Sequence, residues 1–319
     1  MLKYFQVGNK MIKSEQYWEC HHDSTLELFK KRPLWMGNYD NDYPSAIFIR
    51  GLISEYKPEN LLEIGTAAGW AAYYMLEEAL KHNNHAKLVS LDNIEFVYYN
   101  EEKKIGAAFQ EVEPDLYKKW ELITSKISID FLNNSDKKFD FVFIDASHVH
   151  PWATLDFISV LPFLNENAIV VFHDVFLNKI REGKMPADRH PDGTVTGEKN
   201  VSRGPNVLYN LLKKEMTLSY DTIAPNCSAL IVNSSKKEYI LKKMALSLGK
   251  NWEYSHMSYP YLRDIAKKYL PFIEKHFGFE MYKLFKSAFE KQLFFARLCY
   301  EFRKNKKRME LFSLMYFDF

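Results

Sequence analysis

Acidic and histidine residues follow four short apolar segments of the chain. Glu63 stands just before Gly65, and Asp92, Asp145 and the pair His173-Asp174 each end an apolar run. A charge beside buried apolar residues is costly unless it has a partner. Carboxylates accept hydrogen bonds and ligate cations, and an imidazole can accept or release a proton near neutral pH. These residue types therefore predict ligand binding, metal coordination or proton transfer.

The first of these segments ends in a turn of small residues, Gly65-Thr66-Ala67-Ala68-Gly69. Small residues let a ligand approach the backbone closely, and the helix that follows offers free N–H groups. The spacing differs from the Gly-x-Gly-x-x-Gly of dinucleotide sites, and the acidic Glu63 precedes the turn. S-adenosylmethionine has no pyrophosphate, but it carries an ammonium and a sulfonium that a carboxylate can face, so we expect it here. The alternative is a turn whose small residues serve packing alone.

The segments that must position these residues alternate between strand and helix patterns. Short apolar runs predict parallel strands, and the amphipathic segments between them predict helices on both faces of a sheet. The predicted strands are 61–65, 87–91, 121–124, 139–145 and 168–172, with a closing pair at 218–223 and 228–232, and the predicted helices are 70–80, 100–110 and 151–161. We therefore expect an α/β, Rossmann-like domain over residues 59–235, with helical segments at 1–58 and 236–319.

In an open parallel sheet, ligands bind at the carboxyl ends of the strands, so the residues named above should meet at one edge. Asp92, at the end of the second predicted strand, can accept hydrogen bonds from both ribose hydroxyls of an adenosine. Its alternative role is that of a turn or helix-cap aspartate. The residues expected to bind the cofactor are Glu63, Gly65, Thr66, Ala67, Gly69, Asp92, Asn93 and Asp145.

Together these motifs resemble those of the class I methyltransferases. The motifs are Glu63-Ile64-Gly65-Thr66-Ala67-x-Gly69, Ser90-Leu91-Asp92, Phe143-Ile144-Asp145-Ala146-Ser147-His148 and Phe172-His173-Asp174. They are similar to the branch that includes catechol, caffeoyl-coenzyme A, and bacterial sugar and macrolide O-methyltransferases, over roughly residues 45–235. The resemblance implies a seven-stranded sheet whose last strand is antiparallel, with Glu63, Gly65 and Gly69 around the methionine part and Asp92 on the ribose. One departure is Ala67, where many class I enzymes have glycine.

The resemblance also implies a metal. In this branch a magnesium ion often lies between an acidic residue ending the fourth strand and two residues ending the fifth, and here these positions hold Asp145, His173 and Asp174. Histidine is a poor ligand for Mg²⁺, so Mn²⁺ or Fe²⁺ is the variant that this set would suit. Without a metal, His173 or His148 would be the general base that takes a proton from a substrate hydroxyl. We therefore expect the catalytic residues to be His173, His148 and Asp145, with a helix cap or a supporting contact as the alternative for His148.

The predicted activity is transfer of a methyl group from S-adenosylmethionine to an oxygen nucleophile on a small molecule or saccharide. The alternatives are a nucleic-acid methyltransferase, a non-catalytic protein that keeps the fold, and an enzyme that uses the fold for a different reaction. Residues 236–319 hold eighteen Lys and Arg against nine Asp and Glu, a balance that would suit phosphate contacts. However, the core has no Asn-Pro-Pro-Tyr-like motif of base methylation, which disfavours a nucleic-acid substrate.

Composition adds expectations about location. No apolar run approaches the roughly 18–20 residues that span a bilayer, and the first residues lack the pattern of a secretory signal. Cys20, Cys227 and Cys299 lie far apart in the sequence and form no Cys-x-x-Cys pair. These features predict a cytoplasmic protein without a membrane span.

Two further segments predict accessory roles. Residues 176–204 combine glycines, prolines and charges with little periodicity, and they leave directly from His173-Asp174. Loops of this length are uncommon in compact domains, so we expect a lid over the acceptor pocket, with a solvent-exposed loop as the alternative. In the tail, one helical face holds Phe285, Phe289, Leu293, Ala296 and Tyr300. The C-terminal helices are also candidates for forming a homo-oligomer.

Overall fold

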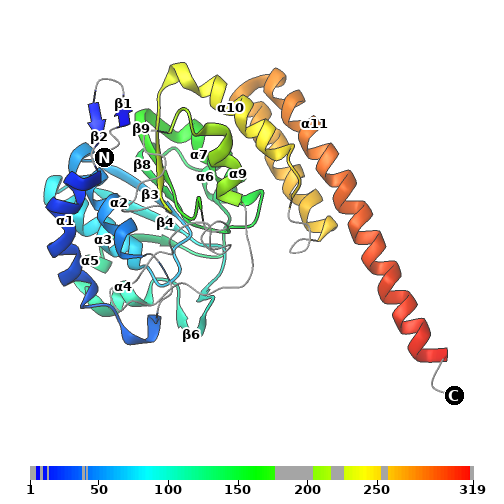
Figure 1. The fold of residues 1–319 in the computed structure, drawn as a ribbon, viewed down its shortest axis with the longest axis horizontal. Coiled ribbons are helices and arrows are strands. Elements are labelled where there is room, and N and C mark those ends of the chain that lie inside the picture. The colour runs from blue at the N-terminus through cyan, green and yellow to red at the C-terminus, as the bar shows by residue number, and fades with distance from the viewer. Residues whose placement is uncertain are drawn as a thin grey trace.

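The computed structural model describes residues 5–7, 10–12, 14–37, 40, 42–176, 204–216, 226–252 and 258–316. Within them, a central sheet has six strands in the order β10-β9-β8-β3-β4-β7 (Figure 1). The strands are β3 Asn60–Ile64, β4 Lys87–Leu91, β7 Glu121–Ile123, β8 Phe139–Ile144, β9 Leu164–Phe172 and β10 Ser228–Val232. β10 pairs antiparallel with β9, and the other neighbours are parallel. The predicted α/β sheet with an antiparallel last strand is confirmed, while the predicted strand at 218–223 lies outside the described residues.

Helices form a layer on each face of this sheet (Figure 1). The first layer holds α1 Ser14–Phe29, α2 Tyr43–Tyr56 and α3 Trp70–His82, and the second holds α6 Ser128–Leu132, α7 Trp152–Val160, α9 Gly204–Leu212, α10 Ser234–Leu248 and α11 Tyr259–Tyr316. Successive side chains of a strand point to opposite faces. In β8, Phe141 and Phe143 therefore pack in the core of the first layer, while Val142 and Ile144 pack in the core of the second. Burial on both faces explains why the central strands are almost wholly apolar.

Short elements connect these layers. They are the strands β1 Phe5–Val7 and β2 Lys10–Ile12, the 3₁₀ helices η1 Leu34–Met36 and η2 Leu161–Phe163, and the helices α4 Ala107–Val112 and α5 Pro114–Tyr117.

The predicted helix at 100–110 is wrong in its first half. Asn100–Lys104 is a strand, β6, that pairs antiparallel with β5 Phe96–Val97, and helix α4 starts only after Gly106. The segment Asn-Glu-Glu-Lys-Lys has no apolar side chain with which a helix could pack on the core. Its backbone N–H and C=O groups form hydrogen bonds in a hairpin instead of in a helix.

The C-terminal part of the chain is helical, as predicted. α11 contains a kink at Gly278, whose φ of 84° lies in the left-handed region that favours glycine. After the kink, Phe285, Phe289 and Ala296 are buried, and the end of the helix extends away from the sheet (Figure 1). No helix in the described part of the chain is long and apolar enough to cross a membrane. The predicted lid at 176–204 lies outside the described residues except for its two end residues.

A buried arginine links the three helices of the first layer. Arg50 of α2 donates from Nε to Glu78 Oε2 at 3.0 Å, from Nη1 to Thr25 Oγ1 at 2.6 Å, and from Nη2 to Glu77 Oε2 at 3.3 Å. Thr25 belongs to α1, and the two glutamates belong to α3. Burial acts to raise the pKa of Glu78, but Arg50 and Lys81 outweigh burial and hold that pKa below its usual value. The Glu78 carboxylate therefore depends on Arg50 for its charge balance.

Replacing Arg50 with methionine should lower the free energy of unfolding by about 3–5 kcal/mol, because it removes the buried cation that pairs with Glu78 and leaves that carboxylate only the more exposed Lys81 and His82. Urea unfolding followed by circular dichroism measures this change. Lys137→Met, which removes the partner of the half-exposed Glu121, is the control and should cost less than about 1 kcal/mol. Equal losses for the two variants would show that the Arg50 cluster does not stabilise the fold.

Candidate active site

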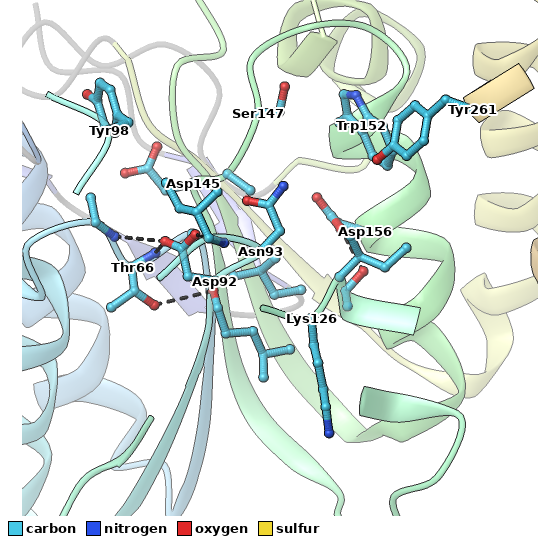
Figure 2. Close-up of a pocket in the computed structure, with 18 residues that line it drawn as sticks. Thr66, Asp92, Asn93, Tyr98, Lys126, Asp145, Ser147, Trp152, Asp156 and Tyr261 are labelled. Carbon is cyan, nitrogen blue, oxygen red and sulfur yellow. Dashed lines mark hydrogen bonds between the residues drawn. The ribbon is translucent and has the colours of Figure 1, made fainter. Parts of the chain in front are cut away.

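The carboxyl ends of four neighbouring strands meet at one edge of the sheet and enclose a pocket of about 340 Å³ (Figure 2). Its wall includes six of the eight residues that the sequence predicts to bind a cofactor: Gly65, Thr66, Ala67, Asp92, Asn93 and Asp145. Glu63 and Gly69 do not line it. The parallel order β8-β3-β4 places the end of β3 between the ends of its two neighbours, which explains why their terminal residues converge.

The turn after β3 has a backbone that requires glycine. Gly65 has a φ of +93°, and a Cβ atom there would lie 2.3 Å from the carbonyl oxygen of Asp145. Gly69 has a φ of +82°, and a Cβ atom there would lie 2.9 Å from Gly106 Cα. Gly65 therefore lets β8 approach the turn at the pocket, whereas Gly69 serves packing against the start of α4.

Asp92 holds the same turn from the neighbouring strand. Its Oδ2 accepts hydrogen bonds from the backbone N–H groups of Thr66 and Ala67, both at 3.0 Å, and its Oδ1 accepts one from Ile94 N at 3.2 Å (Figure 2). The structure thus places Asp92 both as a cap of the turn, which was the alternative from sequence, and on the wall of the pocket. The two roles are compatible because a carboxylate has about four lone-pair directions.

Carboxyl groups gather around the turn. Glu63 is fully buried, and burial raises its pKa well above the usual value, with Asp145, Asp40 and Asp92 raising it further. Burial also raises the pKa of Asp40 to about 7, although its Oδ2 accepts a hydrogen bond from Ala68 N at 3.1 Å. A positively charged ligand at the turn would relieve this repulsion. Asp40 follows no strand and lies in no motif, so the sequence contained no signal for it.

Two histidines lie among the acidic residues beside the pocket. His173 Nδ1 is 3.0 Å from Asp145 Oδ1, and its Nε2 is 3.2 Å from both Asp42 Oδ2 and Ser45 Oγ. His148 Nε2 is 2.7 Å from Asp174 Oδ2 and 3.6 Å from Asp145 Oδ1. Asp42 caps α2 by accepting from Ser45 N at 2.7 Å, so α2 begins against His173. The sequence brought the histidines and Asp145 together, but it did not indicate Asp42 or Ser45.

The electrostatics of this cluster act on the charge of both imidazoles. Burial acts to lower the pKa of His148, but Asp174 and Asp145 outweigh burial and raise it to about 10. Burial also acts to lower the pKa of His173, but Asp145 and Asp174 outweigh burial and raise this pKa well above its usual value. Despite burial, the two histidines hold the pKa of Asp174 below its usual range. The carboxylates thus favour the protonated form of each imidazole in this arrangement, and a protonated imidazole cannot accept a proton.

The cluster contains a donor set for a metal ion. One ligand atom each from Asp145, His148 and Asp174 lies within 4.8 Å of the others. Two carboxylates and one imidazole suit a divalent ion such as Mn²⁺ or Fe²⁺, and Asn226 Nδ2 donates to Asp174 Oδ1 and orients it. The set predicted from the sequence has His173 in place of His148, but both ring nitrogens of His173 face oxygen atoms of the protein. The residues present thus fit a metal ion in the set Asp145, His148 and Asp174, and His173 contacts this set through Asp145.

The end of the predicted lid also lies at this cluster. Gly204 N donates to the carbonyl oxygen of His148 at 2.7 Å, and the start of α9 therefore packs on the segment after β8. The other end of the predicted lid begins two residues after Asp174. Both ends of the segment are thus next to the acidic and histidine residues.

Residues 62–175 match the model of a family described as a methyltransferase domain. The match covers about a third of the chain. The matched segment begins in β3 and ends just after β9, so it includes the turn at Gly65, Asp92, Asp145 and the pair His173-Asp174. No curated protein sequence matches the chain.

Several solved structures are similar to the chain. The O-methyltransferase TomG from Streptomyces achromogenes, in complex with SAM, is 17% identical, with a TM-score of 0.45 over 69% of this chain and 89% of that one. An O-methyltransferase from Bacillus cereus, in complex with SAH, is 16% identical, with a TM-score of 0.44 over 69% and 90%. The SAH-bound Podospora anserina methyltransferase PaMTH1 is 14% identical, with a TM-score of 0.45 over 70% and 98%. Each likeness is remote in both sequence and superposition.

The pocket has further wall residues that sequence reasoning missed: Tyr98, Lys126, Ser128, Trp152, Asp156 and Tyr261. Tyr98 follows β5 in the hairpin that replaces part of the predicted helix. Trp152 and Asp156 belong to α7, and Tyr261 comes from α11, outside the matched segment. None of these residues directly follows a strand of the central sheet, so the reasoning that found Asp92 and Asp145 could not find them.

Gly65→Ala should lower the free energy of unfolding by about 2–4 kcal/mol, because the added Cβ meets the Asp145 backbone and the φ is strained for alanine. Thermal and urea unfolding measure the loss. Gly249→Ala is the matched control. Its φ is −73° and its added Cβ has no neighbour closer than 3.5 Å, so stability should change by less than about 1 kcal/mol. A Gly65→Ala variant as stable as Gly249→Ala would contradict the described contact between the turn and β8.

Proposed function

We propose that this protein transfers the methyl group of S-adenosylmethionine to an oxygen nucleophile on a small molecule or a saccharide. The observation that carries this proposal is the pocket between the Gly65 turn and Asp92, which opens beside the cluster of Asp145, His148 and Asp174. A pocket wall rich in carboxylates suits the ammonium and sulfonium of the cofactor, and Asp92 is placed to accept the ribose hydroxyls. The matching methyltransferase domain supports the same function.

Methyl transfer is an in-line displacement, in which the S–CH₃ bond breaks as the O–CH₃ bond forms and the acceptor hydroxyl loses its proton. The protein's main tasks are to align the two reactants and to help remove that proton. We favour a metal-assisted route over a free His173 base, because Asp145 and Asp174 raise the pKa of His173 and a protonated imidazole cannot accept a proton. His148 would release its proton when it ligates the ion. We propose that Asp145, His148 and Asp174 hold a divalent ion, which when bound would lower the pKa of the acceptor hydroxyl. His173 orients Asp145 through its Nδ1.

The cofactor proposal predicts that S-adenosylhomocysteine binds the protein and that Asp92→Asn weakens binding roughly tenfold or more. Asparagine keeps one acceptor oxygen for the turn, but its amide group removes the acceptor that faces Ile94 N and the ribose side. Thermal unfolding of the variant therefore accompanies the binding measurement, so that a loss of folding is told apart from a loss of binding. Isothermal titration calorimetry measures both affinities. Asp115→Asn, at an exposed position on α5, should bind like the wild type. Absence of binding to the wild type at millimolar ligand would reject the proposed function.

The metal proposal predicts that chelator-treated protein binds Mn²⁺, and that His148→Ala and Asp174→Ala each weaken this binding by about tenfold or more. His173→Gln should retain more affinity, because its amide can replace hydrogen bonds to Asp145 or Asp42. Calorimetry and electron paramagnetic resonance of the bound ion provide the readouts. A larger loss for His173→Gln than for His148→Ala would favour the set Asp145, His173 and Asp174, and no binding by the wild type would remove the metal from the proposal.

We also propose that α11 mediates a homo-oligomer. Phe295, Leu298 and Phe302 lie at heptad-like spacing and are 40%, 52% and 73% exposed, on a helix whose other face is buried. Introducing glutamate at Leu298 and Phe302 should reduce the mass measured by light scattering after size-exclusion chromatography. An unchanged mass, or a monomeric wild type, would reject this interface.

We also propose a cytoplasmic location, which is supported by three free cysteines that lie far apart.

A further inference from the structure

The pocket has a second end, distinct from the Gly65 turn. Figure 2 shows Thr66 on one side of Asp92 and Asn93, and Asp156, Trp152 and Tyr261 on the other. These last three residues come from α7 and from the start of α11. The second end of the pocket is therefore built partly by the C-terminal helices, beyond the matched segment 62–175.

Asp156 is a buried carboxyl on the wall of this second end. Its side chain accepts a hydrogen bond from Ser128 Oγ at 2.6 Å, and Ser128 Oγ in turn accepts one from Ser159 Oγ at 2.8 Å. Among the residues that the structure describes, no lysine, arginine or histidine forms an ion pair with Asp156. Burial raises its pKa to about 7, and the Ser128 hydrogen bond offsets only part of this effect. A buried acceptor with so little support gains from any N–H donor that a ligand brings.

Aromatic side chains lie next to this acceptor. Trp152 and Tyr261 have ring centroids 5.8 Å apart with planes at 40°, and both rings line the pocket. Ile94 and Ile127 add apolar surface to the same wall. A hydrogen-bond acceptor beside flat, apolar surfaces is the combination that recognises a heteroaromatic ring bearing an amino group.

We propose that Asp156 accepts a hydrogen bond from the 6-amino group of the cofactor's purine, with Trp152 and Tyr261 against the ring. The inference rests on the proposed function, because it names the end of the pocket that holds the nucleobase of S-adenosylmethionine. It assigns Asp156 as the residue that distinguishes a 6-amino from a 6-oxo purine. It also makes α11 a part of the cofactor site through Tyr261.

The test compares two ligands by calorimetry: S-adenosylhomocysteine and S-inosylhomocysteine, which carries an oxygen in place of the 6-amino group. At about pH 8.5, above the pKa of about 7 that burial gives Asp156, the wild type should bind the inosyl compound roughly tenfold or more weakly, because its 6-oxo group presents an acceptor to the ionised Asp156 carboxylate. Asp156→Asn offers both a donor and an acceptor, so the ratio of the two affinities should fall to near one. Asp130→Asn, at a half-exposed position on α6, is the control and should keep the wild-type ratio.

The ratio of the two affinities separates a role of Asp156 in recognising the nucleobase from a purely structural role. If Asp156 only connects α6 to α7, Asp156→Asn weakens both ligands equally and the ratio stays as in the wild type, which overturns the inference. Wild-type protein that binds both compounds equally overturns it as well. Protein that binds neither compound rejects the proposed function itself, so the two failures are distinguishable.

A second variant tests the contribution of α11. Tyr261→Ala should weaken S-adenosylhomocysteine several-fold, whereas Tyr239→Ala, at a similarly exposed tyrosine of α10, should leave binding unchanged. Wild-type affinity in Tyr261→Ala would show that α11 is not part of the cofactor site. This measurement does not depend on the folding of the Asp156 variant.

Discussion

The arrangement of the site depends on one buried imidazole. His173 lies between Asp145 at 3.0 Å and Asp42 at 3.2 Å, so a single cation separates two carboxylates that would otherwise repel each other. Asp145 ends β8, His173 follows β9, and Asp42 caps α2. This contact therefore fixes the start of the N-terminal helix layer against the edge of the sheet where the proposed chemistry takes place. Without it, both the direction of the Asp145 side chain and the position of α2 would lose their support.

Neighbouring strands also determine the shape of the turn after β3. Asp92 accepts hydrogen bonds from two backbone N–H groups of the turn, and the carbonyl of Asp145 lies where a Cβ of residue 65 would be. The turn is therefore shaped by the two neighbouring strands rather than by its own residues alone. Preorganisation of this kind lowers the cost of ordering a ligand site, because the polar groups already lie in place.

Segments outside the matched region complete the site. The N-terminal part contributes Asp40, Asp42 and Ser45, which contact the turn or His173, and the C-terminal part contributes Tyr261 to the pocket wall. The two extensions pack on opposite faces of the sheet, so each reaches a different side of the same edge (Figure 1). Both extensions, which lie outside the matched residues 62–175, thus contribute residues around the same edge of the sheet.

The sequence by itself determined the alternation of strands and helices and the residues that end the strands, because burial on both faces of a parallel sheet leaves a continuous apolar run and then a polar residue. For that reason the amino-acid pattern alone was enough to place Gly65, Asp92, Asp145 and His173 at one edge. Only the tertiary structure decided that His148 lies with Asp145 and Asp174 in one group of possible ligand atoms, because His148 and His173 contact the same carboxylates and differ in where their ring nitrogens point. It also decided that Asp42, Asp156 and Tyr261 belong to the site. Periodicity reports the face that an element buries, but contacts between segments far apart in sequence depend on how those elements pack.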